Sequence, residues 1–216
     1  MPEEDHYPFI IHPFENFDQI LGKSSISIYV KEYLEHISAK TCICETEYID
    51  KDYLIDYSKF YARSYSNIPK LTKRYHFFKE EISKENFQNL LETNDPERLK
   101  LIKESYLGFI VVKEEIKDPL SNYLFGRTLL TTYKQHDGDD ERLFLKHRYQ
   151  ANLFGINLEV DSLPFQQQDE AIGACATVAC WISHFPLQQL FGIQSLSPIE
   201  ITERAQSIPS DCRNFP

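Results

Sequence analysis

The chain has 216 residues, 42% of them apolar and 13% aromatic, which suffices for a packed core in one large domain or two small ones. Its 33 acidic and 23 basic residues give a net charge of −10. This acidic balance argues against nucleic acid as a partner, because binding to a phosphate backbone requires a basic surface. The acidic N-terminus lacks a signal-peptide pattern, and no apolar run approaches membrane length. The sequence therefore predicts a cytoplasmic protein without a membrane partner.

Cysteine usage predicts neither disulfides nor a metal site. The five cysteines, at positions 42, 44, 175, 180 and 212, are odd in number and lack disulfide-framework spacing, as expected in a reducing compartment. Cys42 and Cys44 would point to the same face of a strand, but no second Cys/His pair follows at zinc-site spacing. The acidic tract at 136–140 lacks the ligand spacing of a calcium loop. We therefore expect no metal and no cofactor.

The chain before residue 165 alternates between helical and strand patterns. Residues 1–25 show no clear periodicity and are expected to form an extended arm. In a predicted helix at 52–65, Leu54, Tyr57, Phe60 and Tyr61 are spaced for one buried face. Ser83 and Asp95 are good N-caps for two further helices. The remaining elements are a helix at 27–36 and strands at 41–49, 74–78, 109–112, 128–133, 143–145, 149–154 and 158–163.

The most informative stretch runs from Gln166 to Trp181. From Gly173 to Ile182 nearly every side chain is small or apolar on all helical faces, which is typical of a buried helix. This helix would begin just after Gly173, with Cys175 in its first turn. Farther on, Ser197-Pro198-Ile199-Glu200 matches a capping box with proline at the first helical position, so another helix is expected there.

A cysteine at a helix start allows two interpretations. The free N–H groups and partial positive charge of a helix N-terminus favour a thiolate, and they can also hold the oxyanion of an acyl-transfer intermediate. Gln168 is a candidate to donate a side-chain amide to that oxyanion. Alternatively, Cys175 is a small buried hydrophobe, as most free cysteines are. For Cys180, between Ala179 and Trp181, only this second interpretation applies.

The order of Gln168, Cys175 and an apolar helix with Trp181 resembles the papain-like cysteine peptidases, and most closely those of the bacteriocin-processing C39 type. The resemblance covers about residues 166–206. It implies that Cys175 is the nucleophile, that Gln168 assists the oxyanion, and that the substrate is a peptide or protein.

A cysteine nucleophile also needs a base within hydrogen-bond reach. His184 would lie ~13 Å from Cys175 along the same helix, which is too far. His136 and His147 precede the cysteine, and their distance from it cannot be read from the sequence. Papain-like enzymes take the base from a sheet that follows the cysteine helix. We therefore expect the catalytic His and Asn to lie beyond Pro216, so that this chain alone is inactive.

Together these patterns predict an α+β protein with two parts. A mixed helix and strand region at 1–165 leads into the N-terminal part of a papain-like domain at 166–216. The predicted function is that of a cysteine-dependent hydrolase, specifically a peptidase, or of an acyl transferase. The alternative is a non-catalytic binding or scaffold protein in which the Cys175 helix is core and the aromatic-rich N-terminal region engages a partner.

Overall fold

A computed structural model describes residues 8–65, 68–117, 123–132, 146–168, 175–194 and 196–207. These residues form an α+β fold around one antiparallel sheet, which confirms the predicted class. The sheet has seven strands in the order β1-β2-β3-β4-β5-β7-β6, and every neighbouring pair is antiparallel. The strands are β1 (Phe9–Pro13), β2 (Thr41–Tyr48), β3 (Thr72–Phe78), β4 (Tyr106–Lys117), β5 (Tyr123–Thr131), β6 (His147–Leu153) and β7 (Ile156–Phe165).

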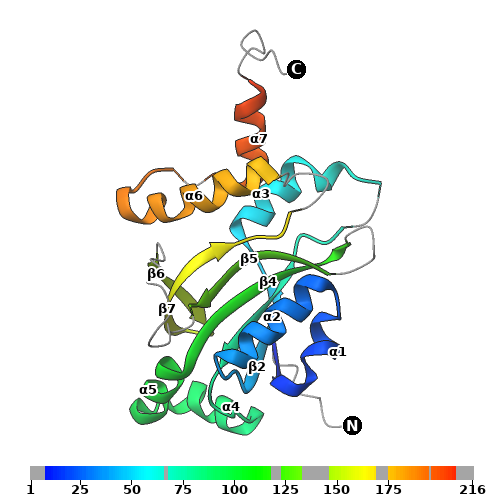
Figure 1. Ribbon diagram of the computed structural model, residues 1–216. Coiled ribbons are helices and arrows are strands. Elements are labelled where there is room, and N and C mark those ends of the chain that lie inside the picture. Colours follow the sequence, from blue (N-terminus) through cyan, green and yellow to red (C-terminus); the bar gives the residue numbers. More distant parts are fainter. Residues whose placement is uncertain are drawn as a thin grey trace, which may run out of the picture.

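The sheet curls into a half-barrel (Figure 1). β1 and β6 stand at opposite ends of the strand order, yet the ring of Phe154, which follows β6, lies 5.3 Å from that of Phe9 in β1. Arg74 of β3 also donates a hydrogen bond to the backbone oxygen of Asn152 in β6. The concave face therefore encloses side chains from both halves of the sheet.

Helices cover both faces of this sheet. On the convex face α1 (Phe17–Leu21) and α2 (Ser25–His36) pack against strand residues such as Phe77 and Ile110. The concave face packs against α4 (Lys84–Thr93), α5 (Pro96–Ser105) and α6 (Cys175–Phe191). A smaller apolar cluster joins α3 (Lys51–Lys59) to α7 (Pro198–Gln206), which points away from the sheet in Figure 1.

Local sequence signals placed several of these elements correctly. The side chains of Ser83 and Asp95 accept backbone hydrogen bonds at the starts of α4 and α5, and Ser197 and Glu200 form the predicted capping box of α7. Cys42 and Cys44 are both buried on the same face of β2, as the C-x-C spacing predicted. Short-range capping and strand alternation determine these features, so the sequence alone shows them.

Two predictions about the N-terminal region were wrong. Residues 1–25 include strand β1, the helix α1 and a short 3-10 helix (Phe14–Asn16), and Phe17 and Leu21 are core residues. The helix predicted at 52–65 ends at Lys59, and Leu54 and Phe60 are exposed, whereas Tyr61 is buried as predicted. It buries two acids instead, because each finds a distant hydrogen-bond donor: Asp52 accepts from Trp181 Nε1 and Asp56 from the Ile199 amide. The predicted strand at 143–145 lies outside the described residues.

The division at residues 165 and 166 stays a prediction. Trp181 and Phe185 of α6 belong to the same core as sheet residues such as Phe109, and α7 contacts α3.

Within the described ranges, no helix has the length and apolar character required to cross a membrane.

Candidate active site

Cys175 is the first residue of α6, and its side chain is exposed. Its Sγ donates a hydrogen bond to Oε1 of Gln168, at 2.9 Å. The structure therefore brings together the two residues that the sequence predicted for one site. Gln168 lies on the segment that follows β7, and Cys175 lies at the beginning of α6.

The segment that carries Gln168 is attached to the sheet through its neighbour. The side-chain oxygen of Gln167 accepts from the Phe125 amide at 3.0 Å, and the Gln167 amide donates to the Phe125 oxygen at 2.9 Å. These two bonds continue the pairing of β7 with β5 beyond Phe165. These bonds to β5 therefore fix the backbone from which the Gln168 side chain extends.

The side-chain amide of Gln168 can form a hydrogen bond with either protonation state of Cys175. Its oxygen accepts from a thiol, as observed, whereas its NH₂ group is a donor. Rotation of the amide by half a turn would present these donors to a thiolate or to an oxyanion. The pair can therefore hold a reactive sulfur and assist the negative charge that develops when the sulfur attacks a carbonyl group.

Trp181 fixes α6 on the sheet. Its side chain is fully buried, its ring centroid lies 4.9 Å from that of Phe185, and its Nε1 donates to Asp52 Oδ2 at 3.1 Å. Val178, one turn earlier, is also buried. This face of the helix sets the direction of α6 and hence the position of Cys175 at its N-terminus.

The prediction that α6 is buried on all sides was wrong. Within the predicted stretch Ala176 and Ala179 are exposed, and Cys180, predicted to be core, is exposed as well. An all-apolar composition contains no information about which face packs, and in the described residues only the Trp181 face meets the sheet. Cys175 and Cys180 are thus two exposed thiols on one helix.

No described histidine hydrogen-bonds to Cys175. His184, nine residues along α6, has its Nε2 3.3 Å from the Gln194 oxygen. The His147 ring lies 5.1 Å from Tyr149, which in turn contacts Phe185, ten residues or ~15 Å along α6 from Cys175. His76 is buried between Glu45 and Tyr106, and burial lowers the pKa of its imidazole to about 4. His136 lies outside the described residues.

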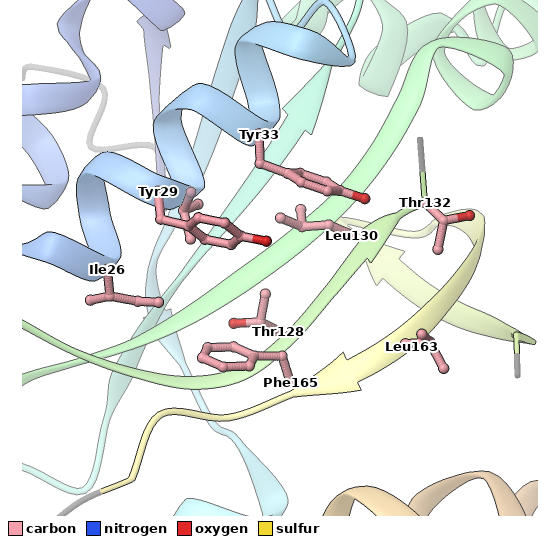
Figure 2. A pocket seen from close by; sticks show the side chains of 9 residues that line it. Ile26, Tyr29, Tyr33, Thr128, Leu130, Thr132, Leu163 and Phe165 are labelled. Atoms are coloured by element: carbon pink, nitrogen blue, oxygen red, sulfur yellow. The ribbon is translucent and has the colours of Figure 1, made fainter. Parts of the chain in front are cut away.

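A second candidate site lies on the convex face, between α2 and the strands β5 and β7. This cavity has a volume of about 310 Å³. It is lined mainly by aliphatic and aromatic side chains, among them Tyr29, Tyr33, Leu130 and Phe165 (Figure 2). Tyr33 is held in place because its hydroxyl donates to the Thr131 oxygen at 2.7 Å. No sequence pattern noted above predicted this site, although two tyrosines four residues apart on a helix lie on one face and could have indicated it.

No family model matches the chain, and the comparisons with curated proteins and with solved structures find no match either. The resemblance to papain-like peptidases therefore rests on the residues around Cys175 and stays a prediction.

Proposed function

We propose that Cys175 is the nucleophile of a cysteine-dependent hydrolase that acts on peptides or proteins, with Gln168 assisting the oxyanion. The observation that supports the proposal is the 2.9 Å contact between Cys175 Sγ and the Gln168 amide, at an exposed helix N-terminus. The finer assignment of residues 166–216 to the start of a papain-like domain belongs to this proposal.

The proposed reaction follows from these groups. The Cys175 thiolate forms a bond to the substrate carbonyl carbon, and the carbonyl oxygen becomes an oxyanion that accepts from the Gln168 NH₂ group and the first free amides of α6. The carbon–nitrogen bond then breaks, and the amine leaves with a proton from a general acid. Water hydrolyses the resulting thioester to a carboxylic acid and the free thiol. The general acid and base are not among the described residues that contact Cys175.

Alkylation of the native chain tests whether Cys175 is activated. With iodoacetamide at pH 6.5, Cys175 is expected to react at least about tenfold faster than Cys180, because the helix N-terminus stabilises a thiolate at its first residue and not in its interior. Peptide mapping by mass spectrometry gives both rates from one sample. Because both thiols are exposed, the comparison reports on thiolate stabilisation and not on access.

Gln168→Ala provides a second arm of the same experiment. We expect it to change the Cys175 rate and to leave the Cys180 rate unchanged, since only Cys175 touches this amide. Equal rates for the two cysteines in the wild-type chain, or a Cys180 rate that exceeds the other, would contradict the proposal.

The cavity in Figure 2 supports a second candidate function, a binding protein. Its apolar lining and its volume of about 310 Å³ fit a small hydrophobic group, and small-molecule sites are commonly apolar cavities of this size. In this alternative the aromatic residues of α2 engage the partner, and Cys175 has no chemical role.

A further inference from the structure

Another cavity, of about 500 Å³, lies between α6 and the concave face of the sheet. It is separate from Cys175, since it meets α6 at Phe185, ten residues along the helix. Its lining combines Arg74, Arg127 and Tyr149 with the apolar side chains of Phe109, Leu129 and Phe185. Charged and aromatic groups therefore converge on one partly open cavity of the concave face.

Two buried donors in this lining have no hydrogen-bond partner among the described residues: Arg127 Nε and the Tyr149 hydroxyl. Tyr149 is only 4% exposed, and burial raises the pKa of its phenol to about 12, so at neutral pH the hydroxyl keeps its proton. Arg127 uses Nη2 to bind Asp50 Oδ2 at 2.6 Å and the Tyr48 hydroxyl at 3.2 Å. A buried polar group without a partner is unfavourable, so these two N–H and O–H groups indicate an acceptor inside the cavity.

The charges around the cavity limit what that acceptor can be. Arg127 is already paired with Asp50, and Arg74 with Glu45. At the rim Arg148 pairs with Asp161 at 2.9 Å and lies 4.0 Å from Glu159. The cavity therefore lacks the excess positive charge that a multiply charged phosphate requires. One or two oxygen acceptors with at most a single negative charge fit better.

We infer that this cavity binds a small organic carboxylate. Its carboxylate accepts hydrogen bonds from Arg127 Nε and the Tyr149 hydroxyl, and its apolar part packs against Phe109, Leu129 and Phe185. Hydrogen bonds to a charged acceptor are stronger than those between neutral groups, and two buried donors therefore favour a carboxylate over a neutral amide. The inference does not depend on a role for Cys175.

Trp181 provides a direct readout for this binding. It is the single tryptophan of the chain, and its ring centroid lies 4.9 Å from that of Phe185, which lines the cavity. Titration of the full chain with sodium benzoate is expected to change the tryptophan fluorescence in a saturable way. Benzamide and inorganic phosphate, used as matched probes, should bind at least about tenfold more weakly.

Tyr149→Phe separates a ligand contact from a structural role. We expect benzoate binding to be weaker by about tenfold or more, which corresponds to one hydrogen bond to a charged acceptor. The unfolding midpoint should be unchanged or higher, because the lost hydroxyl has no partner among the described residues. Tyr33→Phe is the control: its hydroxyl binds the Thr131 oxygen on the other face of the sheet, so benzoate affinity should not change. The inference is overturned by an absence of saturable benzoate binding, by equal binding of phosphate, or by unchanged affinity of Tyr149→Phe.

Discussion

Trp181→Ala is expected to lower the free energy of unfolding by about 3–5 kcal/mol, the range for removing a large aromatic side chain from a core. The ring is fully buried and packs on Phe185, so its loss leaves a cavity under the centre of α6. It also removes the Nε1–H donor from Asp52, a carboxylate that is only 4% exposed. An unpaired buried acceptor adds to the loss.

Urea unfolding followed by circular dichroism measures this effect. Trp181→Phe should lower the free energy of unfolding by less, since it keeps an aromatic ring beside Phe185 and loses only the hydrogen bond and part of the side-chain volume. Leu190→Ala is the matched control on the same helix, because Leu190 is 58% exposed and its removal should change the free energy of unfolding little. If Trp181→Ala lowered the free energy of unfolding as little as Leu190→Ala, α6 would not be attached to the sheet through Trp181.

Asp56→Asn should change how stability depends on pH. Burial raises the pKa of the Asp56 carboxyl from 3.8 to about 7 and outweighs the favourable influence of Lys113 and of the hydrogen bond from the Ile199 amide. Between those two pKa values the folded chain keeps a proton that the unfolded chain has released. This carboxyl therefore contributes stability at low pH, and the contribution is lost as the pH rises towards 7.

Asparagine remains neutral and still accepts a hydrogen bond at Oδ1, so the variant lacks this loss. Between pH 4.5 and 7 its unfolding free energy should rise relative to that of the wild type by about 1 kcal/mol per pH unit. Asp161→Asn is the control, because a hydrogen bond from Arg148 lowers the pKa of this exposed carboxyl, so that it is ionised in both the folded and the unfolded chain above pH 4.5. The difference in unfolding free energy between Asp161→Asn and the wild type should therefore stay constant between pH 4.5 and 7. A difference between Asp56→Asn and wild type that does not vary with pH would show that Asp56 is ionised throughout.

The sequence predicted those parts of the fold that local interactions determine. Ser83, Asp95 and Ser197 cap their helices with bonds to residues two or three positions away. The resemblance to papain-like peptidases also placed Gln168 and Cys175 in one site, and these residues, seven positions apart, are in contact.

Contacts between distant segments account for what the sequence did not show. Asp52 and Asp56 are not among the residues predicted for the buried face of their helix, and their hydrogen-bond donors, Trp181 and Ile199, are 129 and 143 residues away. The curl that brings Phe154 to Phe9, and the cavity around Arg127 and Tyr149, likewise depend on strands far apart in the chain. No local periodicity contains this information.

Acylation by p-nitrophenyl acetate tests the central claim most directly, because an activated ester needs a nucleophile but little help from a general acid. We expect a burst of about one equivalent of p-nitrophenol, an acetyl group mapped to Cys175 and not to Cys180, and negligible turnover afterwards, since no described base touches Cys175 to speed deacylation. Cys175→Ala should abolish the burst. Acetylation that favours Cys180, or a burst that survives in Cys175→Ala, would contradict the assignment of Cys175 as the nucleophile.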